Sequence, residues 1–340
     1  MQQLTFVGPG RLEWQEVAEP TIEGASEALV RPVAVATCDL DASIVKGQSP
    51  FAPPFALGHE CVAEVVSIGE DVEYTRVGDL VVVPFQPSCG TCKFCERGLT
   101  SSCTSVPRTA MYGVGEIGGN FGGAFADLLH VPWADHMLVD LPENVPPESA
   151  ASASDNIADG WRAVSPQLRE QPRAAVAVFG GGGPGSIGLY ATVIAVALGA
   201  ERVDYHDSDR GRLEIAERAG ANVHEVGEWP ERLGTWPITV DSTQDPAGLT
   251  CAIRSTEAWG HCTSTSIYFD GVTPVPMLEM YMKGITLTTG RVPSRTVLPE
   301  VLRLISEGRI DPRIVTTETA DWSDAKEAVA AYTTKLVVTR

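Results

Sequence analysis

The chain has 340 residues, 44% of them hydrophobic and 20% charged, which is typical of a globular protein of more than one domain. Its formal net charge of -19 disfavours binding to the phosphate backbone of a nucleic acid. The longest apolar stretch, residues 187–200, is too short and too interrupted to span a bilayer, so no membrane association is expected.

The first residues carry no signal-peptide pattern, and we therefore expect a cytoplasmic protein. Eight cysteines in a reducing compartment are more often metal ligands or free thiols than disulfides. Short apolar runs separated by turns predict strands over residues 28–32, 61–67 and 79–84, so the first half should be rich in β-structure.

Three residues outside any cluster are candidate ligands of a catalytic metal. Taken singly, each of Cys38, His59 and Asp155 has a more common role than metal binding. A lone cysteine is usually a small core residue, and a lone histidine or aspartate near a turn is usually solvated or caps a helix. Together they would give a zinc ion three mixed ligands and leave one position open. Glu60 could serve as an exchangeable ligand, and Asp41 could accept a hydrogen bond from the free ring nitrogen of His59.

Four further cysteines are closely spaced as C-x2-C-x2-C-x7-C: Cys89, Cys92, Cys95 and Cys103. Zinc prefers a tetrahedron of thiolates, and two-residue gaps let one tight loop aim consecutive sulfurs at a single centre. Four cysteines fill every position, so the spacing predicts a closed, structural zinc site. A disulfide pair or an iron–sulfur cluster is the alternative.

The second half changes to alternating strands and helices, which predicts a parallel sheet covered by helices. Strands are expected over residues 174–179, 202–206, 238–242, 263–269 and 336–339. Helices are expected over residues 186–198, 210–219 and 297–306, with another starting near residue 323.

A glycine-rich turn between the first of these strands and its helix matches the G-x-G-x-x-G pattern at Gly183, Gly185 and Gly188. The pyrophosphate of a dinucleotide would lie at the helix N-terminus, against Ser186 and Ile187. Asp207 and Arg212 follow the next strand. A carboxylate at Asp207 can accept hydrogen bonds from the adenosine ribose and would repel a 2′-phosphate, so NAD is favoured over NADP.

The order of these motifs, Cys-x-x-Asp, Gly-His-Glu, a four-cysteine lobe and a dinucleotide turn, resembles the zinc-containing medium-chain alcohol dehydrogenase family along nearly the whole chain. The resemblance implies that Cys38, His59 and Asp155 hold a catalytic zinc; the acid resembles that of the formaldehyde dehydrogenase-like branch. Asp159 is a rival carboxylate nearby. Leu40 departs from the family, which usually has a proton-relaying Ser or Thr there; water, Asp39 or Ser43 would have to replace it.

The family layout implies a GroES-like β-barrel catalytic domain over residues 1–156 and 291–340, with both zincs, and a Rossmann-type NAD-binding domain over 157–290. The active site would lie between them. Family members are dimers or tetramers, and Ile285–Thr289 is the candidate edge for pairing.

The expected reaction is hydride transfer between an alcohol, or the matching aldehyde or ketone, and NAD. Two alternatives remain: an aldehyde dismutase with tightly bound NAD, and a non-catalytic NAD-binding zinc protein.

Overall fold

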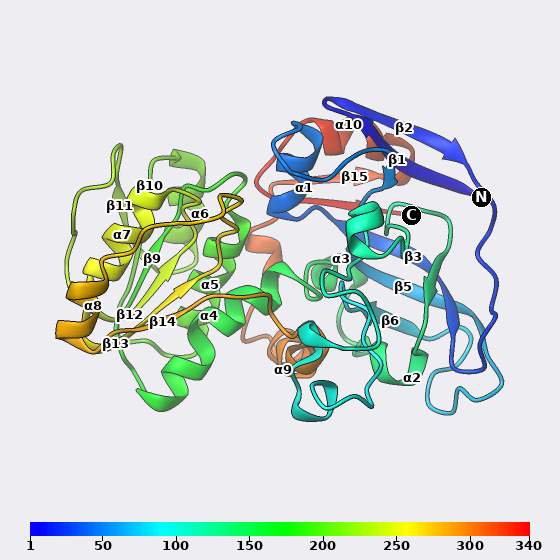
Figure 1. Ribbon diagram of the computed structural model, residues 1–340, viewed down its shortest axis with the longest axis horizontal. Coiled ribbons are helices and arrows are strands. Elements are labelled where there is room, and N and C mark those ends of the chain that lie inside the picture. Colours follow the sequence, from blue (N-terminus) through cyan, green and yellow to red (C-terminus); the bar gives the residue numbers. More distant parts are fainter. The chain divides into compact units, whose positions relative to one another are not determined.

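The computed structural model describes residues 1–340, and the chain divides into two units (Figure 1). The first unit consists of Met1–Ala158, Val292–Asp311 and Thr316–Arg340. The second consists of Asp159–Arg291 and Pro312–Val315. No helix is long and apolar enough to cross a membrane.

The first unit is built on two sheets that are almost entirely antiparallel. The three-stranded sheet has the order β2-β1-β4, formed by β1 (Gln2–Gly8), β2 (Arg11–Glu16) and β4 (Phe55–Ala56). The seven-stranded sheet has the order β15-β16-β3-β5-β6-β8, and β7 pairs with β3. Its strands are β3 (Ala28–Ala36), β5 (Glu60–Ile68), β6 (Leu80–Val83), β7 (Leu129–Val131), β8 (Val139–Asp140), β15 (Glu318–Asp321) and β16 (Leu336–Thr339).

The first unit also contains five helices: α1 (Asp39–Val45), α2 (Ala134–Met137), α3 (Pro147–Ala150), α9 (Ser294–Ser306) and α10 (Ala325–Ala330). Strands β3 and β5 overlap the strands predicted over residues 28–32 and 61–67, and most of their residues are buried or half-buried. Helix α4 (Asn156–Glu170) begins in the first unit and continues into the second.

The second unit contains one parallel six-stranded sheet, in the order β11-β10-β9-β12-β13-β14. Its strands are β9 (Val176–Phe179), β10 (Val203–Asp207), β11 (Asn222–Glu225), β12 (Trp236–Asp241), β13 (Thr256–Ser264) and β14 (Thr286–Thr288). Its other helices are α5 (Ser186–Ala197), α6 (Arg210–Arg218), α7 (Pro246–Arg254) and α8 (Met277–Lys283).

Helices cover both faces of this sheet, which explains why β9 is buried throughout. Ala177 and Phe179 face the cluster that contains residues of α7. Val178 points the other way, toward α5, where a Cβ added at Gly188 would lie 3.5 Å from Val178 Cγ1. The doubly covered parallel sheet predicted from the alternating elements is therefore confirmed.

One predicted strand was wrong in position. The sequence favoured residues 263–269, whereas β13 runs from Thr256 to Ser264. Trp259 has a φ of 62°, and the register with β12 shifts between Trp236 and Ile238. This irregularity breaks the alternation of apolar residues and so concealed the start of the strand.

Candidate functional site

Cys38 is placed by the start of helix α1, for which it is the N-cap residue. Its Sγ accepts a hydrogen bond from the backbone N of Leu40 at 3.4 Å. Its own backbone N donates to Asp41 Oδ2 at 2.8 Å, which completes a capping box. The Cys-x-x-Asp pattern therefore fixes both the helix start and the direction of the thiol.

His59 is placed by the turn that enters strand β5. Gly58 has a φ of +91°, and a Cβ there would lie 2.6 Å from the ring of Phe125, so only glycine fits. Strand β5 pairs with β3, with Glu60 opposite Ala36, and this pairing brings His59 close to the segment that carries Cys38.

Asp155 completes the group from the segment just before α4. Its Oδ2 lies 3.1 Å from Cys38 Sγ and 3.3 Å from His59 Nε2, and the ligand atoms of all three residues lie within 4.8 Å of one another. Zinc bonds of the usual length predict tetrahedral edges of about 3.3–3.6 Å between such atoms, close to these two distances. All three side chains are buried, and their spacing fits a zinc ion.

The charges around these residues also fit a cation. Both ring nitrogens of His59 are buried without a hydrogen-bond partner. Burial opposes a charged imidazole, yet Asp41 and Asp155 raise the pKa of His59 to about 9. Burial and then the neighbouring carboxylates raise the pKa of the Cys38 thiol well above its usual value. The chain alone therefore disfavours the thiolate, and a divalent cation would reverse this.

Two nearby carboxylates, Asp41 and Asp159, have other partners in the structure. Asp41 Oδ1 lies 3.7 Å from His59 Nδ1, which is too long for the hydrogen bond that we expected. Asp41 instead caps α1. The rival carboxylate Asp159 forms an ion pair with Arg162 at 2.6 Å and lies outside the group of potential ligands.

Two polar residues beside this group, Asn156 and Lys335, were not predicted from the sequence. Neither side chain is exposed, and Lys335 Nζ lies 2.6 Å from Glu60 Oε2. Glu60 also accepts from the backbone N of Asn156 at 2.7 Å. No spacing rule pointed to Lys335, because it precedes a short strand far along the chain.

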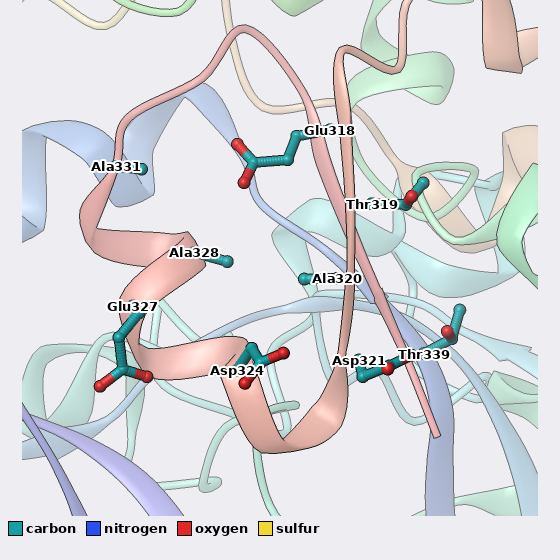
Figure 2. A pocket seen from close by; sticks show the side chains of 9 residues that line it. All are labelled: Glu318, Thr319, Ala320, Asp321, Asp324, Glu327, Ala328, Ala331 and Thr339. Carbon is teal, nitrogen blue, oxygen red and sulfur yellow. The ribbon is translucent and has the colours of Figure 1, made fainter.

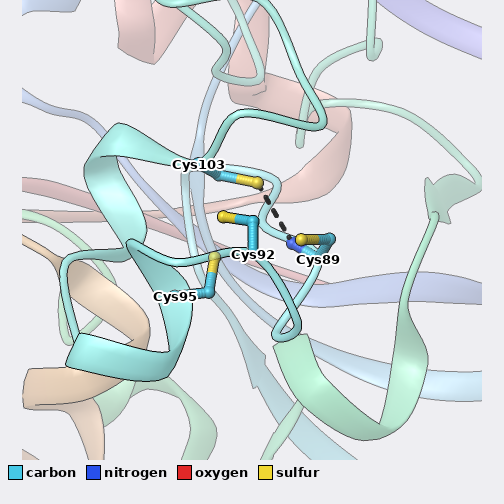
Figure 3. Close-up of side chains that lie close together, drawn as sticks. All are labelled: Cys89, Cys92, Cys95 and Cys103. Carbon is cyan, nitrogen blue, oxygen red and sulfur yellow. Dashed lines mark hydrogen bonds between the residues drawn. The ribbon is translucent and has the colours of Figure 1, made fainter.

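The four remaining predicted ligands form a second group in the first unit. The sulfurs of the four cysteines lie within 4.8 Å of one another, and none is disulfide-bonded. Figure 3 shows them directed toward a common centre. Backbone N–H groups of Cys89 and Ser105 donate to Cys103 Sγ at 3.4 Å and favour a thiolate there, although burial keeps the pKa of Cys103 above its usual value.

In the second unit, the glycine-rich turn leads from β9 into α5 as predicted. Gly185, the N-cap of α5, has a φ of +77°, and a Cβ there would lie 2.8 Å from Arg212 Cδ. A side chain at this position would thus be strained and would also meet Arg212. Gly183 accepts a hydrogen bond from Arg212 Nη1 at 3.2 Å. Ser186, Ile187 and Gly188 form the first turn of the helix.

Asp207 lies at the end of β10 and is fully buried. Its Oδ2 accepts from Arg212 Nε and from the hydroxyl of Tyr205, each at 2.8 Å. Its Oδ1 accepts from Arg212 Nη2 at 2.8 Å and from the backbone N of Asp209 at 2.9 Å. The carboxylate and the guanidinium therefore form a neutral, bidentate pair.

A separate hollow of about 520 Å³ lies on β15 and α10 (Figure 2). Four acidic residues line it: Glu318, Asp321, Asp324 and Glu327. None of them belongs to either group of potential metal ligands. The hollow and the two metal-ligand groups are therefore distinct features of the first unit.

Residues 24–143 match the family model described as the alcohol dehydrogenase GroES-like domain. A probable zinc-binding alcohol dehydrogenase of Mycobacterium tuberculosis is 31% identical over 335 residues, covering 97% of this chain and 85% of the relative. A glutathione-independent formaldehyde dehydrogenase of Pseudomonas aeruginosa is 31% identical over 312 residues, covering 85% and 73%. An alcohol dehydrogenase structure from Thermus sp. ATN1 has a TM-score of 0.88 and 27% identity, covering 100% and 99%.

Proposed function

Because this chain belongs to the zinc-containing medium-chain alcohol dehydrogenase family, it is a zinc-dependent oxidoreductase that uses a nicotinamide cofactor, and we propose that Cys38, His59 and Asp155 hold its catalytic zinc. The family confirms the predicted GroES-like and Rossmann fold class. The observation that carries the proposal is the convergence of three buried ligand atoms around an imidazole whose nitrogens have no other partner.

Zinc bound at such a site acts as a Lewis acid that lowers the pKa of an alcohol and polarises a carbonyl. The chain supplies three ligands, the number typical of catalytic sites that keep one position open. Leu40 has no hydroxyl, so the alcohol proton must leave by another route. Asp39 and Ser43, on the same helix, have polar side chains that could provide it, and water is the alternative.

We further propose that the chain binds two zinc ions, the second within the four-cysteine lobe, where it would be structural. Four sulfurs occupy every tetrahedral position, so no substrate could bind there. The unit with both ligand groups would be the catalytic domain, and the unit with the glycine-rich turn would be the NAD-binding domain.

NAD is proposed as the preferred cofactor. Arg212 is only 8% exposed, and its charge is neutralised by Asp207, so it offers no uncommitted cation to a 2′-phosphate. Gly183, Gly185 and Gly188, with Ser186 and Ile187, would hold the pyrophosphate at the start of α5.

We also propose that the protein is a homo-oligomer that pairs through the second unit. Strand β14 is the edge of the six-stranded sheet. Eight large apolar side chains are exposed nearby in sequence, each between 46% and 85%: Trp259, Ile267, Phe269, Val272, Met277, Leu278, Tyr281 and Met282. So many exposed apolar groups are typical of a surface that is covered in the assembly.

The test of the catalytic site combines metal analysis with turnover. Cys38→Ala should lose turnover with every member of a panel of primary, secondary, aromatic and polyol alcohols, yet retain NADH binding. Its zinc content should fall from two per chain to one. Cys61→Ala, which removes another buried thiol, is the matched control and should keep its turnover and its two zinc ions per chain. Undiminished turnover in Cys38→Ala would refute the assignment.

The formaldehyde dehydrogenase relative, together with the carboxylate ligand, favours formaldehyde as a second substrate candidate. Formaldehyde should therefore be included in the panel, with and without added NAD. Product formation without added NAD would favour dismutation with a tightly held cofactor.

A further inference from the structure

The strongest unassigned feature is a set of buried hydrogen bonds around Lys335, beside the proposed zinc ligands. The ammonium group donates to Asn156 Oδ1 and to the carbonyl oxygen of Thr37, each at 2.5 Å, and to Glu60 Oε2 at 2.6 Å. An ammonium group has three protons and accepts no hydrogen bond. These three contacts match its three donors, and Glu60 balances its charge.

This arrangement decides which way the Asn156 amide faces. Since Lys335 can only donate, the atom of Asn156 next to it must be the carbonyl oxygen, and the NH2 group must face the other way. There, Nδ2 lies 3.2 Å from Cys38 Sγ and 3.4 Å from Asp155 Oδ2. The backbone N of Asn156 is held as well, by Glu60 Oε1 at 2.7 Å.

We propose that Asn156 is a positioning residue of the metal site, which holds Cys38 Sγ and Asp155 Oδ2 side by side through its amide NH2 group. The inference rests on the proposed function, because it treats both residues as zinc ligands. These two atoms are 3.1 Å apart and would both be anionic in the loaded site, so they repel each other. A donor shared between them offsets this repulsion.

The amide would also tune the ligands that it holds. An N–H group that donates to a thiolate withdraws electron density from the sulfur, so Cys38 binds the metal less covalently and the metal stays a stronger Lewis acid. Lys335 and Glu60 act through Asn156, because they hold its carbonyl oxygen and its backbone N–H group and so orient the amide. Partners of this kind typically change metal affinity or activity 10–100-fold when removed.

The experiment uses full-length protein carrying Asn156→Leu, which has a similar size but no amide, with exposed Asn144→Leu as the control in the same unit. Two readouts do not depend on turnover. The first is the rate at which a chelator removes zinc from the Cys38 site. The second is the wavelength of the sulfur-to-cobalt charge-transfer band after replacement of zinc by Co²⁺, read as the difference between variant and parent.

Zinc release should be about 10–100-fold faster in Asn156→Leu, and the charge-transfer band should move to longer wavelength, because the sulfur becomes a better electron donor. Asn144→Leu should change neither. If Asn156→Leu does not fold, Asn156→Ala tests the same loss of donors. Unchanged release and an unchanged band in a folded variant would overturn the inference.

Cys38→Ala distinguishes this failure from failure of the proposed function. If Cys38 is a ligand, its loss removes the charge-transfer contribution of that site, whatever Asn156 does. A cobalt spectrum that Cys38→Ala leaves intact would reject the metal site itself. A spectrum that changes in Cys38→Ala but not in the Asn156 variants would reject the positioning role alone.

Discussion

Acidification should destabilise the second unit through one histidine, His206, and His206→Phe should remove much of that effect. His206 lies on β10 and is 3% exposed. Its ring stacks on Phe179 with centroids 5.2 Å apart and on His224 at 4.6 Å. Burial and then the charge of His224 lower its pKa to about 4 from the usual 6.5, although Asp204 acts in the opposite direction.

The sign follows from the protons bound by each state. Between pH 6.5 and 4 the unfolded chain protonates this histidine and the folded chain does not, so folding is favoured at high pH and loses stability as the pH falls. A pKa of 6.5 unfolded and about 4 folded gives a loss of about 1.8 kcal/mol between pH 7 and pH 5, and of about 3 kcal/mol well below pH 4. Phenylalanine preserves the stack and cannot take up the proton.

The assay is native-state hydrogen exchange of peptides that contain β9 and β10, corrected for the intrinsic effect of pH on exchange. In the parent protein, the protection of these strands should fall about 20-fold between pH 7 and pH 5, in line with the free energy above. His206→Phe should show a much smaller fall, whereas His261→Gln, on β13, should behave like the parent. An equal fall in His206→Phe and the parent would refute the reasoning.

Further predictions concern the ion pairs, the cysteine lobe and the oligomer. Lys335→Met leaves Glu60 buried without its cation and should lower the free energy of unfolding of the zinc-free first unit by roughly 3–5 kcal/mol, measured in urea. The control Arg11→Met removes an exposed ion pair and should cost under about 1 kcal/mol. Asp207→Ser should free Arg212 and raise kcat/KM with NADP relative to NAD; an unchanged ratio would count against the proposed preference. Cys92→Ser should lose one zinc per chain and lower the melting temperature, and loss of turnover at full thermal stability would contradict a structural role. Leu278→Asp should shift the protein toward monomer in sedimentation experiments, while a similar change at exposed Tyr74 in the first unit should not.

The elements that the sequence predicted well are those whose signal is local. Strand β16 and the start of α5 agree with the prediction to the residue. The four-cysteine group also follows from spacing alone, since a short loop can bring its sulfurs together. In such segments the neighbours along the chain determine the structure.

Features that depend on contacts between distant segments could not be predicted in this way. The spacing of Cys38, His59 and Asp155 says nothing about their distances, and only the family resemblance suggested that they meet. Strands β1 and β2 were not anticipated, because their burial depends on pairing with each other and with β4. The sequence likewise gives no sign that Asp207 and Arg212, both candidate cofactor contacts, form an ion pair with each other.

The most informative missed residue is Lys335, because it changes how the buried charges balance. Asp41, Glu60, Asp155 and the thiol of Cys38 can all carry a negative charge, and each is at most 9% exposed. Lys335 offsets one of them, through Glu60, and leaves the other three around His59. Burial and then the neighbouring carboxylates raise the pKa of Cys38, and the carboxylates raise the pKa of His59 against the effect of burial, so both groups hold their protons when no other cation is present. A divalent ion would displace both protons and balance the remaining charge, whereas a neutral ligand would do neither.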